Sequence, residues 1–137
     1  MNRERFVVDT NVLVSAALVP GTTPDHAIVT AIGRGILLFS NSTIEELNDV
    51  LMRARFDRYA SVERRTAFIA RLVMESEIVV VSKRIVACRD PKDDKLLEVA
   101  INGSATCIVT GDDDLLVLNP FRGIPILTPR DFVGTMS

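Results

Sequence analysis

Short runs of valine, isoleucine, leucine and phenylalanine recur along this chain without polar alternation, and longer segments with helical spacing separate them. A strand that is apolar on both faces is typical of a parallel sheet whose two faces are covered by helices. The pattern therefore predicts an α/β fold with a five-stranded parallel sheet. We expect the strands at residues 6–8, 36–39, 78–81, 107–109 and 124–127.

The segments between these runs carry helix signals. Thr23-Pro24 and Asp90-Pro91 are typical helix starts, because proline is favoured at the first helical position. Ser42 and Glu45 fit a capping box at the start of another helix. The segment 42–76 contains two helices and no strand, so we expect a helical hairpin over one edge of the sheet. The expected helices are at residues 11–18, 24–33, 42–54, 62–75, 91–100 and 112–118, with a terminal turn from residue 128.

Length and charge exclude several classes of protein. A chain of 137 residues with 47% hydrophobic content fits one domain, which we place at residues 1–137. Its apolar stretches are shorter than the roughly 20 residues of a membrane-spanning helix, and no cleavable signal pattern is present, so we expect a cytoplasmic protein with no membrane partner. The net charge of −2 argues against a uniformly basic nucleic-acid clamp.

The scarcity of histidine and cysteine limits the available chemistry. His26 is the single histidine of the sequence, and Cys88 and Cys107 belong neither to a CxxC motif nor to a Cys/His cluster. These features disfavour a structural zinc site, a disulfide framework and a nucleophile paired with histidine. Acid–base or metal chemistry is therefore expected to use carboxylates.

Acidic residues gather near the ends of the predicted strands. Because ligands of open α/β sheets bind at the carboxyl ends of the strands, we expect several of these carboxylates to share one crevice. Such a cluster repels itself and is stabilised by a proton or by a hard divalent cation. The acidic residues concerned are Asp9, Glu45, Glu46, Asp90, Asp93, Asp94, Asp112, Asp113 and Asp114.

Each of these acidic residues also has a purely structural interpretation. Acidic side chains are favoured in the first turn of a helix, and Asp90 is well placed to cap one. Helical spacing places Glu46 at the border of the apolar face of its helix and points Glu45 to water. The same spacing places Asp93 and Asp94 on one face and leaves the choice between them open.

Four motifs occur in order along nearly the whole chain: VVDTNVLVSA, STIEELNDVL, DPKDDKLLEVA and IVTGDDDLL. Together they resemble the PIN-domain family of metal-dependent ribonucleases, most closely the VapC-like toxins of bacterial and archaeal toxin–antitoxin pairs. The resemblance implies a three-layer α/β sandwich with strand order 3-2-1-4-5. It also implies Mg²⁺ or Mn²⁺ as the cofactor.

The same resemblance implies roles for individual residues. Within the acidic doublets 45/46 and 93/94 the assignment stays open. The implied catalytic acids are Asp9, Glu46, Asp94 and Asp112. The implied metal ligands are Asp9, Asp94, Asp112 and Asp114. The implied supporting residues are Thr10, Asn11, Thr110 and Asp93.

Arginines are concentrated between residues 53 and 71, where six arginines accompany two acidic residues. Arginine favours bidentate contacts with phosphate, so this segment is a candidate for binding nucleic acid. A second interpretation, in which the segment contacts an antitoxin or a second copy of the chain, stays open. The candidate nucleic-acid contacts are Arg53, Arg55, Arg64 and Arg65.

These observations predict a Mg²⁺-dependent endoribonuclease that hydrolyses RNA phosphodiester bonds as the toxin of a toxin–antitoxin pair. Its expected partners are RNA, a small antitoxin protein and a second copy of the chain. Two alternatives stay open: a non-catalytic RNA- or protein-binding α/β module with a structural metal ion, and a receiver-like phosphotransfer domain. Against the latter, Pro129 and Arg130 stand where a receiver-like domain usually has a lysine.

Overall fold

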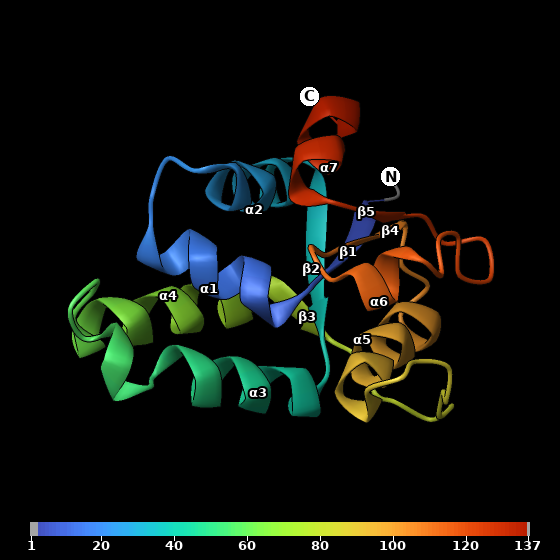
Figure 1. The fold of residues 1–137 in the computed structure, drawn as a ribbon, viewed down its shortest axis with the longest axis horizontal. Coiled ribbons are helices and arrows are strands. Elements are labelled where there is room, and N and C mark those ends of the chain that lie inside the picture. The colour runs from blue at the N-terminus through green and yellow to red at the C-terminus, as the bar shows by residue number, and fades with distance from the viewer. Residues whose placement is uncertain (1–2, 137) are drawn as a thin grey trace.

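Five parallel strands form one sheet in the order β3-β2-β1-β4-β5, with helices on both of its faces (Figure 1). The structure is a computed structural model and describes residues 3–136. The order and the parallel pairing confirm the predicted α/β fold. The strands are β1 (Glu4–Val8), β2 (Gly35–Phe39), β3 (Ser76–Ile78), β4 (Cys107–Val109) and β5 (Ile126–Leu127).

The helices lie close to their predicted positions. As expected, α3 and α4 follow one another between β2 and β3 and pack together as a hairpin (Figure 1). A short 3-10 helix, η1 (Ala54–Phe56), joins them. The helices are α1 (Thr10–Leu18), α2 (Thr23–Arg34), α3 (Asn41–Leu51), α4 (Val62–Met74), α5 (Pro91–Asn102), α6 (Asp113–Leu116) and α7 (Pro129–Met136).

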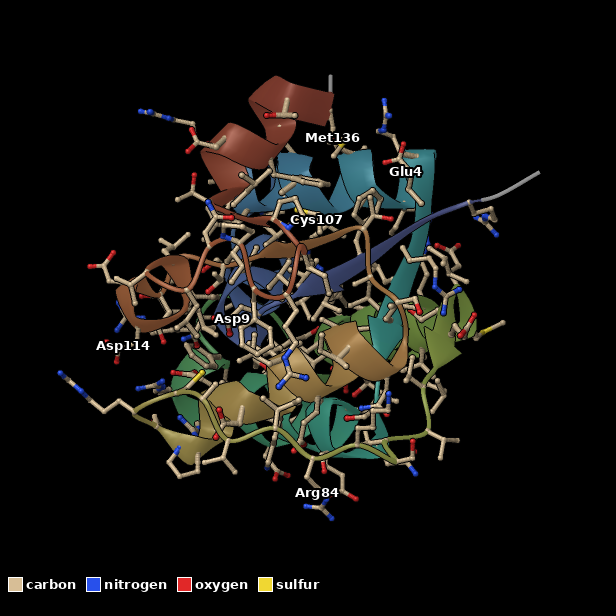
Figure 2. All side chains as sticks on the ribbon, turned by 90° about the vertical axis from the view of Figure 1, so that its right-hand side faces the viewer. Glu4, Asp9, Arg84, Cys107, Asp114 and Met136 are labelled. Carbon is tan, nitrogen blue, oxygen red and sulfur yellow. The ribbon has the colours of Figure 1, made fainter. Side chains whose placement is uncertain are left out.

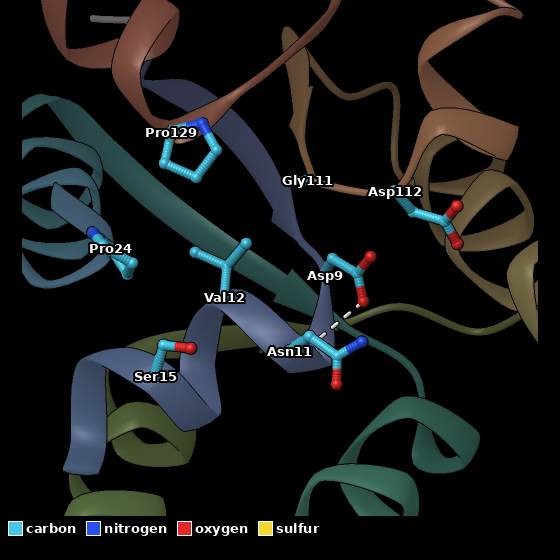
Figure 3. A pocket seen from close by; sticks show the side chains of 8 residues that line it. All are labelled: Asp9, Asn11, Val12, Ser15, Pro24, Gly111, Asp112 and Pro129. Carbon is cyan, nitrogen blue, oxygen red and sulfur yellow. Dashed lines mark hydrogen bonds between the residues drawn. The ribbon is translucent and has the colours of Figure 1, made fainter. Parts of the chain in front are cut away.

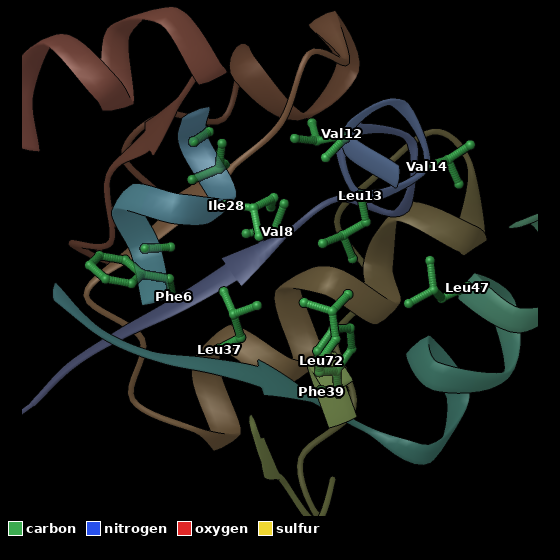
Figure 4. Packing of buried hydrophobic residues seen from close by; sticks show 14 of the residues in the cluster. Phe6, Val8, Val12, Leu13, Val14, Ile28, Leu37, Phe39, Leu47 and Leu72 are labelled. Carbon is green, nitrogen blue, oxygen red and sulfur yellow. The ribbon is translucent and has the colours of Figure 1, made fainter. Parts of the chain in front are cut away.

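Successive residues of β1 point to opposite faces of the sheet and enter two separate apolar cores. Phe6 and Val8 belong to the core that α1, α2, α3, α4 and α7 cover, and Figure 4 shows part of this packing. Val7 belongs to the second core, which α5 and α6 cover. Because both faces are buried at the end of β1, its last three residues, Phe6, Val7 and Val8, are all apolar, which explains this unalternating run. The fold is the predicted three-layer sandwich.

The predicted strand at residues 78–81 is wrong beyond Ile78. Ile78 pairs with Phe39, the last residue of β2, and the chain after Phe39 turns into α3. Past this point β3 has little of the neighbouring strand left to pair with: Val79 donates one backbone hydrogen bond to the carbonyl of Phe39, at 2.7 Å. Val80 then leaves the sheet, and its side chain is 85% exposed. The strand begins instead at Ser76.

The C-terminal part of the chain also differs from the expectation. β5 comprises only Ile126 and Leu127, because Ile124 pairs with Phe121 in a short antiparallel bridge. The terminal turn expected from residue 128 is an eight-residue helix, Pro129–Met136. The predicted strand 124–127 is longer than β5 because a β-branched residue favours extended backbone whether or not a partner strand is present.

The start of α3 corrects the predicted capping box. The helix begins at Asn41, with Ser40 as its N-cap. The Ser40 hydroxyl accepts a hydrogen bond from the backbone of Thr43, and the Thr43 hydroxyl accepts one from the backbone of Ser40. Thr43 therefore takes the capping role that the predicted box gives to Glu45, and Ser42 and Glu45 are both exposed on α3.

No single helix within residues 3–136 is both long enough and apolar enough to cross a membrane. α1 and α2 reach the required length and composition only when they are taken together, and the chain bends by 108° between them. Residues on both helices, such as Leu13 and Ala31, are buried in the core against the sheet.

Candidate metal centre

The carboxyl ends of β1 and β4 bring two acidic residues to the same edge of the sheet. Asp9 follows β1 directly, and Asp112 follows β4 after Thr110 and Gly111. β1 and β4 are parallel neighbours, and Val8 pairs with Val109 at their ends. Figure 2 shows Asp9 and Asp114 on one side of the molecule, away from Glu4 at the start of β1.

Asp9 is held rigidly at this edge. Its carboxylate accepts a hydrogen bond from the Thr110 hydroxyl at 2.7 Å and one from the backbone of Asn11 at 3.3 Å. The same Thr110 hydroxyl accepts a hydrogen bond from the backbone of Asp112 at 3.0 Å, so one hydroxyl connects both strand ends. Burial raises the pKa of Asp9 despite these hydrogen bonds, and the negative charge of Asp112 adds to the effect.

Three more carboxylates converge beside Asp9. Oxygen atoms of Asp93, Asp112 and Asp114 all lie within 4.8 Å of one another. Asp112 is also the N-cap of α6 and accepts a hydrogen bond from the backbone of Asp114. Partial burial and the neighbouring charges of Asp112 and Asp9 raise the pKa of Asp93 to about 7. An arrangement of this kind favours a bound proton or a bound cation.

Glu46 contributes a carboxylate from α3 to a cleft that Asp9, Asp93 and Asp112 also line. Its Oε2 accepts a hydrogen bond from the Thr10 hydroxyl at 3.1 Å, which joins α3 to the start of α1. The cleft has a volume of about 260 Å³, and three cationic side chains also line it: Arg53, Arg55 and Lys92. We call the acidic cluster the four cleft carboxylates Asp9, Glu46, Asp93 and Asp112 together with Asp114, which adjoins Asp93 and Asp112. Asp90, the N-cap of α5, lines the cleft as well.

The donor set of the acidic cluster fits a hard divalent cation. Every side chain offers carboxylate oxygen, the ligand that Mg²⁺ and Mn²⁺ prefer, and no histidine or cysteine belongs to the group within residues 3–136. None of the ion pairs found in that range involves one of the five carboxylates. Asp93, Asp112 and Asp114 could hold the ion directly, with Asp9 next to them.

Asp94 does not lie in the cluster, contrary to the expectation that it supplies the third acid. Its Oδ1 accepts hydrogen bonds from the backbones of Ala87 and Cys88, at 3.0 and 2.8 Å. Burial alone would raise the pKa of Asp94, but these hydrogen bonds outweigh it and hold the pKa below its usual value. Asp94 thus fastens the loop before α5 to that helix, and Asp93 faces the cleft in its place.

The structure places the predicted supporting residues Thr10, Thr110 and Asn11 around the cleft, with different contacts to the acids. Thr10 and Thr110 are buried and bond to acids of the cluster, whereas Asn11 is exposed at the mouth of the cleft. Lys92 was not predicted. It lies between Asp90 and Asp93 in the sequence. A lysine beside acidic residues usually forms a surface ion pair, so the sequence around Lys92 does not indicate that it lines the cleft.

Arg65 is a wrong prediction as a nucleic-acid contact, because its side chain is only 1% exposed. Its guanidinium pairs with Asp57 and donates hydrogen bonds to four backbone carbonyls of the α3–α4 hairpin. Arg64 is exposed on α4 but is not among the residues that line the cleft. Arg53 and Arg55 do line it. The carbonyls bonded to the guanidinium belong to Leu51, Arg53, Ala60 and Ser61.

Comparison with known proteins gives two matches. A family model described as PIN domain matches residues 5–114 of the chain, a range that includes the whole acidic cluster. The chain is also 26% identical, over 139 residues, to a protein of Methanocaldococcus jannaschii named "Uncharacterized protein MJ1680". That alignment covers 94% of this chain and 89% of the relative.

The position of Asp93, and not Asp94, in the acidic cluster leads to a prediction about metal affinity. Asp93→Asn should weaken Mn²⁺ binding by about tenfold or more, because it removes one carboxylate from the group of three. Asp94→Asn should change the affinity by less than about twofold, since an amide oxygen can still accept the two backbone hydrogen bonds. Titration followed by electron paramagnetic resonance of free Mn²⁺ measures both. A larger loss in Asp94→Asn would contradict the placement.

The burial of Arg65 leads to a prediction about stability. Arg65→Met should lower the free energy of unfolding by about 3 kcal/mol, because buried carbonyls of the hairpin lose their donor. Arg64→Met, at the neighbouring exposed position, should change it by less than about 0.5 kcal/mol. Urea unfolding monitored by circular dichroism compares the two variants, and equal effects would show that Arg65 does not hold the hairpin together.

Proposed function

The chain belongs to the PIN domain family, and from this premise and the geometry of the acidic cluster we propose that it is a divalent-metal-dependent endoribonuclease. The observation that carries the proposal is the convergence of Asp93, Asp112 and Asp114 within 4.8 Å beside the buried Asp9. Structural acids at helix starts have no reason to gather in this way, because their mutual repulsion destabilises the fold.

The residues of the cleft would have different roles in phosphodiester hydrolysis. Bound Mg²⁺ or Mn²⁺ would lower the pKa of a water molecule and neutralise charge on the scissile phosphate. Asp93, Asp112 and Asp114 would hold the ion, and Asp9 adds a carboxylate that Thr110 fixes in position. Glu46, which lines the same cleft, would accept a proton. Attack by water leaves a 5′-phosphate and a 3′-hydroxyl.

The cationic side chains of the cleft support a nucleic-acid substrate. An acidic cluster repels phosphates, so a substrate strand needs cations close by. Arg53, Arg55 and Lys92 line the same cleft as Asp9 and Asp93. From Arg53 and Lys92 the surface continues into a second groove, where Lys95 is a further cation. The acidic residues Glu45, Glu46 and Asp49 line this groove as well. A single strand could follow this path with its phosphates against the cations, and RNA as the substrate follows from the family.

The finer part of the proposal concerns biological role. The four motifs that resemble VapC-like toxins support a cytoplasmic toxin that a small antitoxin protein neutralises and that acts as a homodimer. A neighbouring reading frame for a small antitoxin-like protein would support this role, and a housekeeping function in RNA processing is the alternative. Light scattering of the purified protein would establish whether it is a dimer.

The proposed activity predicts the behaviour of Asp9→Asn. The variant should lose at least about 10³-fold in RNA cleavage, because the cluster loses a buried carboxylate next to the ion. It should fold normally, since asparagine is neutral and can still accept the hydrogen bond from Thr110. Cleavage of labelled RNA is measured with Mg²⁺ or Mn²⁺ and with excess chelator, and folding by circular dichroism. Activity of the parent in chelator would refute metal dependence, and RNA binding without any cleavage would favour the non-catalytic alternative.

The cationic wall predicts the salt dependence of RNA binding. Arg53→Glu should weaken binding and reduce the slope of log affinity against log salt by about 0.7 for each lost phosphate contact. Arg64→Glu makes the same charge change outside the cleft and should leave the slope unchanged. Fluorescence anisotropy with single-stranded RNA, in the Asp9→Asn background to prevent cleavage, measures both slopes. If Arg64→Glu had the larger effect, the strand would run along α4 instead.

A further inference from the structure

A second recess adjoins the acidic cluster, on the side away from the cationic wall. It has a volume of about 390 Å³, and Figure 3 shows the side chains that line it. Val12 of α1, Pro24 of α2 and Pro129 of α7 form its apolar part. Asn11 and Ser15, both exposed on α1, contribute polar groups. An apolar recess with a few polar side chains is the usual character of a site for a small organic group.

The recess and the cleft share a boundary. Asp9, Asn11 and Asp112 line both of them. A strand whose phosphate lies at the acidic cluster would therefore have both the recess and the cationic side chains of the cleft next to that phosphate. A group bound in the recess would therefore lie close to the reacting phosphate.

Charge determines which part of a nucleotide the recess can hold. Among residues 3–136, no lysine or arginine lines it, whereas two carboxylates, Asp9 and Asp112, do. A phosphate or an acidic peptide would be repelled there, and nothing in the lining would compensate. The neutral and flat part of a nucleotide is its base, which can bury its faces against apolar side chains and use its edge for hydrogen bonds.

We propose that this recess is a nucleobase subsite, which binds the base of a nucleotide adjacent to the scissile phosphate. Val12, Pro24 and Pro129 contact the faces of the base, and the Asn11 amide and the Ser15 hydroxyl contact its edge. The inference rests on the proposed ribonuclease function and deepens it, because it assigns the residues that make the enzyme depend on the base next to the cut. A side chain of a protein partner is the competing occupant.

The experiment combines two changes: a substitution that fills the recess in the protein, and an RNA from which one base has been removed. Ser15→Leu places a larger apolar side chain in the recess from an exposed helical position, where leucine is well tolerated. His26→Leu adds the same side chain at an exposed position of α2 that does not line the recess, and it serves as the control. The substrate is a short single-stranded RNA that the parent cuts at one mapped bond, together with copies that carry one abasic nucleotide at each position around that bond.

We expect the two changes, filling the recess and removing the base, to lower kcat/KM by the same effect, so that their losses do not add. In the parent and in His26→Leu, an abasic nucleotide at one position next to the cut should lower kcat/KM by about tenfold. Ser15→Leu should lower kcat/KM on the intact RNA by a similar factor, and the abasic nucleotide should then cause no further loss. Mn²⁺ affinity should be equal in all three proteins, which shows that the acidic cluster is intact.

Other outcomes overturn the inference in distinguishable ways. If the parent cleaves RNA and Ser15→Leu shows the same dependence on the abasic position, the recess does not bind a base and the ribonuclease function stands. If Ser15→Leu leaves cleavage unchanged but weakens binding of a co-purifying protein partner, the recess belongs to that partner. If the parent cleaves no RNA with either metal ion, the proposed function fails and the subsite fails with it.

Discussion

Three carboxylates whose oxygens lie within 4.8 Å of one another repel each other when they are charged. At about 4 Å, two like charges repel by about 4 kcal/mol for an effective dielectric constant of about 20. The free energy of unfolding of a whole domain is only about 5–15 kcal/mol. A proton or a cation bound to Asp93, Asp112 and Asp114 would offset this repulsion. Partial burial and the charge of Asp112 raise the pKa of Asp93 in the same direction.

The parallel sheet explains why the repulsion arises at this place. β1 and β4 are neighbours and end together, so Asp9 and the residues after Thr110 meet whatever their charge. The surrounding surface is then strongly asymmetric. On one side of the cluster Arg53, Arg55 and Lys92 provide positive charge, and on the other side the recess under α7 is mainly apolar. A nucleotide has the same asymmetry between its phosphate and its base, and this correspondence connects the two proposals.

The strand order, the layers and the gathering of acids at one sheet edge could be predicted from the sequence, because buried strands and strand ends leave local patterns. Details that depend on partners distant in the sequence could not. β3 ends where β2 no longer offers a partner, which residues 78–81 themselves do not reveal. Asp93 and Asp94 share a helical face, and only the hydrogen bonds from Ala87 and Cys88 separate their roles. Arg65 resembles its exposed neighbours in sequence but is buried by the turn around η1.

The internal hydrogen bonds of Arg65 have a consequence for how such a chain can change over evolutionary time. The residues that Arg65 contacts all belong to the α3–α4 hairpin or to the turn between its helices, so the hairpin is held by bonds within itself. Its exposed surface can therefore acquire new residues without disturbing the strand ends that carry the acids. Selection for a different binding partner could act on the outer face of the hairpin while the chemistry at the sheet edge stays the same.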